Sequence, residues 1–138
     1  MIQVKEVVKS FGNKENLNKV LKGISLTIKD GEFVVILGAS GSGKSTLLNV
    51  ISGLERPDSG RVSYDSKDIS RLSDKALTEF RKDKVGFIFQ QYYLLPNLNV
   101  DKNVRMGADL AGNGEYRQII EAVGLGGKLD KYPSELSG

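Results

Sequence analysis

The sequence contains no cysteine, no histidine and no tryptophan, and only three prolines. Without cysteine the chain cannot form a disulfide scaffold, a zinc ribbon or a thiol nucleophile. Without histidine it has no Ser-His-Asp triad, no imidazole base and no histidine-ligated metal. A metal site built from carboxylates alone stays open.

Long hydrophobic runs are also absent. The longest uninterrupted aliphatic and aromatic run covers the five residues 33–37, far short of the ~20 that span a bilayer. The first ten residues, MIQVKEVVKS, lack the apolar core of a signal peptide. We therefore expect a soluble intracellular chain. The net charge of +3 is too small to indicate nucleic-acid binding, and no aromatics interleave with the basic residues Lys75, Arg81, Lys82 and Lys84, for which we expect a solvated face.

Glycine is the residue in excess, with 16 in 138 positions against a usual ~7%. The pattern predicts strands in the first 30 residues, with Ile24, Leu26 and Ile28 alternating with polar residues. A polar loop is expected at 12–16 and a turn at 30–31. Strands buried on both faces are predicted at 32–37 (EFVVIL) and 85–89 (VGFIF), and a short strand at 61–64. Helices are predicted at 44–52, 73–82, 100–111 and 115–123.

The residues 38–45, GASGSGKS, match the phosphate-binding pattern G-x-x-x-x-G-K-[ST] in full. Glycines let successive backbone amides turn inward and form a concave anion site. The ammonium of Lys44 reaches β and γ phosphates, the hydroxyl of Ser45 suits Mg²⁺, and a helix starting at Lys44 adds its positive end. The alternative is a flexible Gly/Ser linker. A predicted buried strand before the loop and an apolar-periodic helix after it favour the phosphate site.

Four segments then resemble the ATP-binding cassette of ABC transporters. They are SGSGKSTLLN at 40–49, GLERPDSGRV at 53–62, VGFIFQQYYLLPNL at 85–98 and LSG at 136–138. They occur in the order and spacing of the family, and the resemblance covers nearly the whole chain. The stretch 68–90 is most similar to bacterial cassettes of macrolide export, lipoprotein release and resistance to antimicrobial peptides.

The resemblance implies an α/β fold: a P-loop NTPase (RecA-like) core, an N-terminal antiparallel β subdomain and the start of the helical subdomain. Residues 1–90 would hold the β subdomain and the first part of the core. Residues 91–138 would hold the Q-loop and part of the helical subdomain. It also implies ATP and Mg²⁺ as ligands, with nucleotide-binding residues at Phe11, Gly38, Ser40, Gly41, Ser42, Gly43, Lys44, Ser45 and Thr46.

Roles for two further residues follow from the resemblance. Gln90 would be the Q-loop glutamine that reaches Mg²⁺ and the attacking water. With the residues of the phosphate loop, the expected catalytic residues are then Lys44 and Gln90, and the expected metal ligands are Ser45 and Gln90. Phe11 resembles the aromatic that stacks on adenine. For Gln90 the alternative is a solvated residue at a strand end, and for Phe11 it is ordinary packing.

The resemblance also implies partners. Leu136, Ser137 and Gly138 would begin the signature that contacts the γ-phosphate of a second cassette, in a homodimer of the full-length protein. Residues 92–95 would face a transmembrane permease, or else fill the core of the helical subdomain. The protein would then lie in the cytoplasm, peripheral to the inner face of the cell membrane.

Several parts of the family pattern have no counterpart. The aliphatic run that ends in Asp and Glu and the switch histidine are missing, so we expect a truncated cassette that binds ATP and hydrolyses it negligibly by itself. We also expect an unsatisfied edge at 33–37. Two other functions stay open: a non-transport cassette of translation or DNA repair, and a non-catalytic half-cassette that acts by pairing with a protein. The absence of a coiled-coil insertion between Gln90 and Leu136 favours transport.

Overall fold

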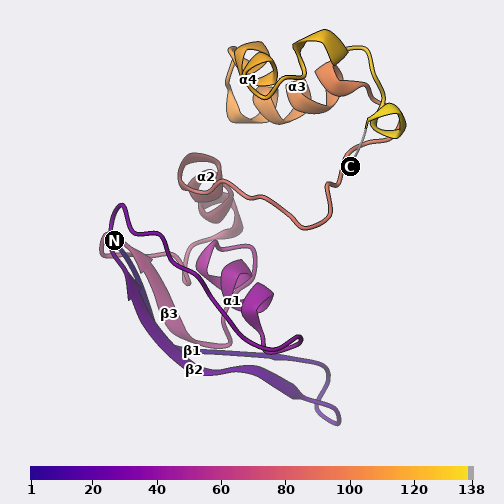
Figure 1. Ribbon diagram of the computed structural model, residues 1–138. Helices are drawn as coiled ribbons and strands as arrows, with labels where there is room; N and C mark the ends of the chain where they lie inside the picture. The colour runs from indigo at the N-terminus through magenta and orange to yellow at the C-terminus, as the bar shows by residue number, and fades with distance from the viewer. Residues whose placement is uncertain (137–138) are drawn as a thin grey trace. The chain divides into compact units, whose positions relative to one another are not determined.

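The computed structural model describes residues 1–136, and its residues fall into two compact units that divide after Gly86. The first unit runs from Met1 to Gly86 and holds a sheet with two helices. The second begins at Phe87 and is helical (Figure 1). Within the part of the chain described, no helix has the length and apolar character needed to cross a membrane.

The sheet of the first unit has four antiparallel strands in the order β2-β1-β3-β4. They are β1 (Ile2–Phe11), β2 (Asn18–Ile28), β3 (Ser59–Tyr64) and β4 (Lys67–Asp68). Along β2, Ile24, Leu26 and Ile28 are half-buried while the residues between them are exposed. The predicted period-two strand is therefore confirmed, as is the polar loop at 12–16 that joins β1 to β2.

A bulge in β1 changes which side chains reach the core. The pairing of β1 with β3 shifts register between Lys5 and Val8, and Glu6 has a φ of 48°. On the opposite strand, a Cβ at Gly60 would lie 2.3 Å from the carbonyl oxygen of Glu6. Only glycine allows this approach. As a result Val4 and Val7, three residues apart, are both buried.

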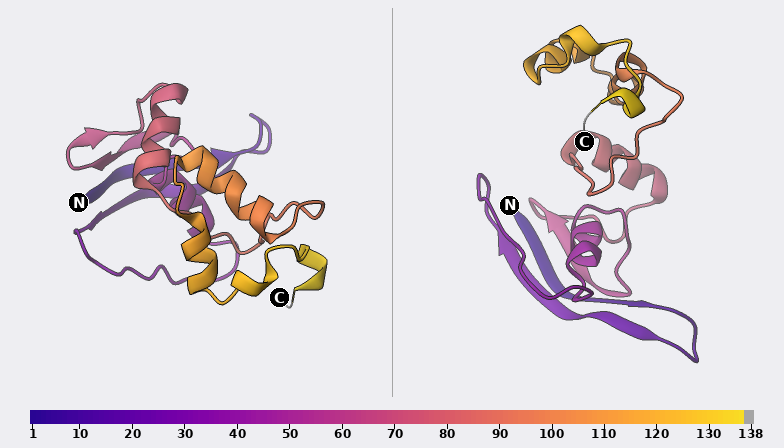
Figure 2. Two further views of the ribbon diagram at one scale, coloured as in Figure 1. Left: turned by 90° about the horizontal axis from the view of Figure 1, so that it is seen from above. Right: turned by 45° about the vertical axis from the view of Figure 1, so that its right-hand side comes forward.

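Two helices of the first unit contribute to the same core. α1 (Lys44–Ile51) buries Leu47, Val50 and Ile51, and α2 (Asp74–Lys84) buries Leu77 and Phe80. In Figure 2 the strands curve and α1 lies on their concave side. The hydroxyl of Ser73 accepts a hydrogen bond from the amide of Ala76, which confirms the predicted start of the second helix.

The second unit is built on two helices, α3 (Val100–Ala111) and α4 (Tyr116–Ala122), followed by two 3₁₀ turns, η1 (Gly126–Lys128) and η2 (Pro133–Glu135). The side chain of Asn99 caps α3, and Gly112 ends it with a φ of 70°. The Tyr116 hydroxyl donates to Asp101 at 3.0 Å and joins the two helices. Both helices lie where the sequence predicts them.

The two predicted buried strands at 32–37 and 85–89 are wrong. Among residues 1–136 the only sheet is the antiparallel one of β1 to β4, and neither segment is part of it. Phe33 and Leu37 are 90% and 86% exposed, and Ile88 is fully exposed. Only Ile36 and Val85 pack partly against the core. A buried parallel strand requires neighbours on both sides. The exposed apolar side chains that we expected at 33–37 are observed, but this segment is not a strand and so has no strand edge.

Candidate functional site

The glycine-rich loop 38–43 leads directly into α1, which begins at Lys44. The first amides of a helix have no acceptor within it, and they give the N-terminus a partial positive charge. The first turn of α1 carries no acidic side chain that would neutralise this charge. The start of α1 therefore has the character of an anion site.

Two glycines give the loop its shape. Gly41 and Gly43 have φ values of 76° and 92°, in the left-handed region that other residues avoid. A Cβ at Gly43 would lie 2.9 Å from Cγ1 of Val20 and 3.3 Å from Cδ2 of Leu21. The loop thus rests on β2 at this point, and the glycine lets the two backbones come close.

The ammonium of Lys44 turns back over the loop. Its Nζ donates to the carbonyl oxygens of Gly38 at 2.9 Å and of Ala39 at 2.7 Å. The amide of Ser42 also donates to the oxygen of Ala39, at 3.2 Å. The ammonium and the loop backbone are therefore held together, next to the amides at the start of α1.

A cleft of about 240 Å³ joins this loop to the end of β1. The residues that line it are Phe11, Val20, Gly41, Gly43, Lys44, Ser45 and Thr46. Phe11 comes from the end of β1 and is 44% exposed. An aromatic ring at one side and amides with an ammonium at the other fit the base and the phosphates of a nucleotide. Of the predicted nucleotide-binding residues, Gly38, Ser40 and Ser42 belong to the loop but do not line the cleft.

The predicted metal ligands lie in different units. Ser45 is exposed at the cleft, and its hydroxyl oxygen is of the type that Mg²⁺ accepts. Gln90 is exposed and lies outside helices and strands, in the second unit. Among residues 1–136, no three acidic, histidine or cysteine side chains gather into a metal-binding group.

The predicted partner residues are also in the second unit. Residues 92–95 are between 42% and 74% exposed, so the alternative that they fill the core of this unit is wrong. Leu136 is half-buried after η2, and its amide donates to the oxygen of Pro133. Ser137 and Gly138, the other two residues of the expected signature, lie outside the described residues.

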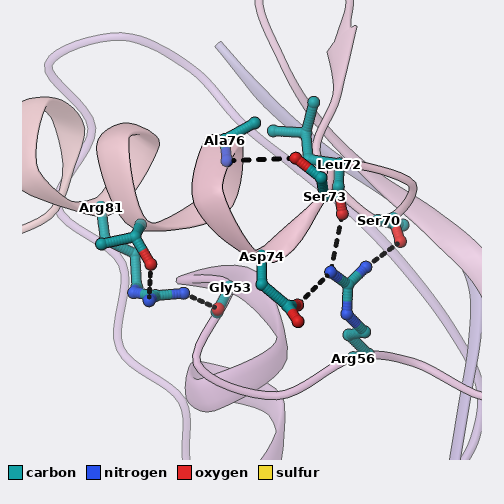
Figure 3. A network of polar contacts seen from close by, with 9 residues as sticks. Gly53, Arg56, Ser70, Leu72, Ser73, Asp74, Ala76 and Arg81 are labelled. Carbon is teal, nitrogen blue, oxygen red and sulfur yellow. Dashed lines mark hydrogen bonds and ion pairs between the residues drawn. The ribbon is translucent and has the colours of Figure 1, made fainter.

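Two arginines that no sequence motif places in a site connect α2 to the rest of the first unit (Figure 3). Arg56 donates to the carbonyl oxygens of Ser70 and Leu72 and to the carboxylate of Asp74. Arg81 donates to the oxygen of Gly53 at 2.9 Å, so it is not a solvated residue as predicted. These partners are 14 to 28 residues away, and no local pattern reveals them.

A larger cavity of about 670 Å³ lies between α2 and the β3–β4 turn. It contains none of the predicted site residues, and its charged side chains are of both signs: Asp65, Glu79 and Asp83 with Lys67, Lys75 and Lys84. Burial raises the pKa of Tyr64, which lines this cavity, above its ordinary value of 10.0. The hydroxyl of Tyr64 donates to the oxygen of Ile51 at 3.0 Å. The cavity has no glycine loop for phosphate.

Comparison with known proteins gives several strong matches over the whole chain. The MG065 homolog of Mycoplasma pneumoniae is 49% identical over all of this chain and 30% of that protein. Bacitracin export ATP-binding protein BceA of Halalkalibacterium halodurans is 40% identical over all of this chain and 57% of that protein. Lipoprotein-releasing system ATP-binding protein LolD of Geobacter metallireducens is 41% identical over all of this chain and 64% of that protein. The chain thus spans less than two thirds of each of these relatives.

Solved structures agree with these matches. The dimeric structure of MJ0796, a bacterial ABC transporter cassette, superposes with a TM-score of 0.87 at 37% identity, over all of this chain and 64% of that one. A second MJ0796 structure, in a post-hydrolysis state bound to ADP and Pi, is 36% identical over 99% of this chain and 63% of that one, also with a TM-score of 0.87. The family model for ABC transporter matches residues 21–138. The α/β cassette fold expected from the sequence is therefore confirmed, and the chain belongs to the ABC transporter family.

Proposed function

We propose that the chain binds ATP in the cleft between Phe11 and α1, with the phosphates in the loop 38–46 and the base on the aromatic ring. The proposal depends on one observation: the same cleft is lined by Phe11 at the end of β1 and by residues of the glycine loop and the start of α1. The similarity to a cassette bound to ADP and Pi supports it.

Each group of the cleft has a role in this proposal. The amides at the start of α1 and of the loop donate to phosphate oxygens. Lys44 exchanges the carbonyl oxygens of Gly38 and Ala39 for the β and γ phosphates. Ser45 would offer its hydroxyl oxygen to Mg²⁺, which would neutralise phosphate charge. By resemblance to the family, Gln90 would offer an amide oxygen to such an ion and orient water.

At the level of the whole protein we propose an ATPase subunit of an export system. BceA and LolD are named as ATP-binding proteins of bacitracin export and of lipoprotein release. In this proposal two cassettes pair, with Leu136, Ser137 and Gly138 on the γ-phosphate of the opposite subunit. The exposed residues 92–95 face a membrane permease, which holds the protein at the inner face of the cell membrane. Hydrolysis and substrate selection belong to that assembly.

Titration calorimetry with Mg-ATP tests the binding. The wild-type chain should bind one nucleotide, and Lys44→Ala should weaken binding about 10- to 150-fold, since a hydrogen bond to a charged group contributes about 1.5–3 kcal/mol. Lys22→Ala is the matched control, because Lys22 is exposed on β2 and is not among the cleft residues. Equal affinities for the wild type and both variants would contradict the proposal.

A further inference from the structure

Lys9 is a largely buried lysine close to the cleft. It lies on β1, two residues before Phe11, and its side chain is only 11% exposed. Its Nζ is 2.6 Å from a carboxylate oxygen of Glu55 and 3.6 Å from one of Asp58, and it donates to the carbonyl oxygen of Arg56 at 2.9 Å. All three partners belong to the loop that follows α1.

This loop is itself fastened at both sides. The amide of Asp58 donates to the oxygen of Val8 at 2.8 Å, and its carboxylate accepts from the amide of Ser10 at 2.6 Å. At the other side, the amides of Leu54 and Glu55 donate to the oxygen of Asn49 in the last turn of α1. Hydrogen bonds therefore connect the C-terminal end of α1 with the end of β1, while the N-terminal end of α1 forms the phosphate site.

The same ammonium also contacts the aromatic ring. Nζ of Lys9 lies 5.2 Å from the centroid of the Phe11 ring, within the ~6 Å of a cation–π interaction. Phe11 lines the cleft, whereas Lys9 is not among its lining residues. The Phe11 ring therefore contacts the Lys9 ammonium, which its ion pairs hold in place, and also lines the cleft.

We propose that Lys9 is a positioning residue for the nucleobase, which holds the Phe11 ring at the cleft through its anchors on the loop 55–58. The inference rests on the proposed ATP site, and Lys9 itself does not touch the nucleotide in it. Ordering of the ring before binding lowers the entropy cost of stacking. The effect concerns the base alone, since the phosphates bind to the loop and α1.

Two ligands separate positioning from general stability: Mg-ATP and inorganic tripolyphosphate with Mg²⁺, which has the phosphates and no base. Calorimetry on the full chain compares the wild type with Lys9→Met, Lys9→Arg, Glu55→Gln and Phe11→Ala. Lys5→Met is the matched control, because Lys5 is an exposed residue of β1 and makes no ion pair among residues 1–136.

Lys9→Met should weaken ATP binding about 2- to 12-fold, from the cost of ordering one free side chain, and leave tripolyphosphate binding unchanged. Glu55→Gln should change ATP binding in the same direction, and it tests the anchor if Lys9→Met does not fold. Lys9→Arg, which keeps the cation, should recover part of the affinity. Phe11→Ala should weaken ATP binding about 5- to 150-fold, the range of base stacking.

Three results would overturn the inference. The first is that Lys9→Met and Glu55→Gln both bind ATP like Lys5→Met. The second is that they lose ATP and tripolyphosphate to the same extent, which indicates a purely structural ion pair. The third is that wild type binds neither ligand or that Phe11→Ala binds ATP normally, which contradicts the proposed site as well.

Discussion

Replacement of Gly43 by alanine should strongly destabilise the first unit, because this position combines a left-handed backbone with a close contact. At a φ of 92°, a residue with a Cβ incurs about 1–2 kcal/mol. That Cβ would meet Cγ1 of Val20 at 2.9 Å and the backbone oxygen of Val20 at 3.4 Å. Overpacking of this kind costs a further ~1–3 kcal/mol.

A smaller effect acts in the opposite direction. Alanine restricts the unfolded chain more than glycine does, which offsets about 0.4–1 kcal/mol. The expected loss in the free energy of unfolding is therefore about 1–4.5 kcal/mol. Gly43 also lines the cleft, so a shift of the loop away from β2 should lower nucleotide affinity together with stability.

Two other glycines of the loop serve as controls. Gly41 has a φ of 76° but nothing within 4 Å of an added Cβ. Gly41→Ala should therefore lower the free energy of unfolding only through the left-handed backbone, by about 0–1.5 kcal/mol. Gly38 has no positive φ. Its added Cβ would lie 2.7 Å from the hydroxyl oxygen of Ser42, a side-chain atom that can rotate away, and at ordinary contact distance from Cβ of Ser42 and Cδ of Lys44. Gly38→Ala should therefore change stability least.

Urea unfolding, followed by far-ultraviolet circular dichroism, measures the three free energies. The expected order of destabilisation is Gly43→Ala, then Gly41→Ala, then Gly38→Ala, with equal m-values, since m reports the surface exposed on unfolding. If Gly43→Ala and Gly41→Ala agree within ~0.5 kcal/mol, the contact with β2 does not constrain the loop and the reasoning is refuted.

Two predictions concern the rest of the first unit. Arg56→Ala should lower the free energy of unfolding by about 1–3 kcal/mol, because the carbonyl oxygens of Ser70 and Leu72 lose a charged donor. Asp74→Asn should cost less, since Asp74 is 96% exposed; a reversed order in urea unfolding would contradict this. Tyr64→Phe should cost about 0.5–1.5 kcal/mol at neutral pH, through the lost hydrogen bond to Ile51. Because burial raises the pKa of Tyr64 in the folded chain, its contribution is complete below the unfolded value of 10.0 and is lost as the pH rises above it. The difference between wild type and Tyr64→Phe in urea midpoint should therefore shrink in strongly alkaline buffer, and a constant difference would refute the assignment to burial.

Local signals predicted much of this molecule. The alternation of Ile24, Leu26 and Ile28 with polar residues is sufficient to place β2, because apolar residues at every second position indicate a strand with one buried face. Ser73 marks the start of α2 because its hydroxyl satisfies an amide that the helix cannot. The glycine loop is predictable because phosphate chemistry fixes its spacing. Each of these depends on residues that are close in sequence.

What the sequence could not show depends on distant partners. The run 32–37 is apolar enough for a buried strand, but periodicity does not reveal whether neighbouring strands are present to pair with it. The bulge at Glu6 requires Gly60, which is 54 positions away in the sequence. The same holds for Lys9, whose nearest partner is Glu55. Its place near the candidate site follows from the strand order and from the course of the loop after α1.

The hydrogen bonds of Lys44 to Gly38 and Ala39 give this lysine a second role, because they stabilise the conformation of the loop in the absence of nucleotide. In the proposed site Lys44 exchanges these oxygens for phosphate, so its replacement has two effects: the charge opposite phosphate is missing in the complex, and the hydrogen bonds are missing in the free loop. A swap to arginine keeps the charge but not the compact geometry of the ammonium. Comparison of the arginine and alanine variants therefore distinguishes the effect of the positive charge on nucleotide affinity from the effect of the hydrogen bonds to the loop.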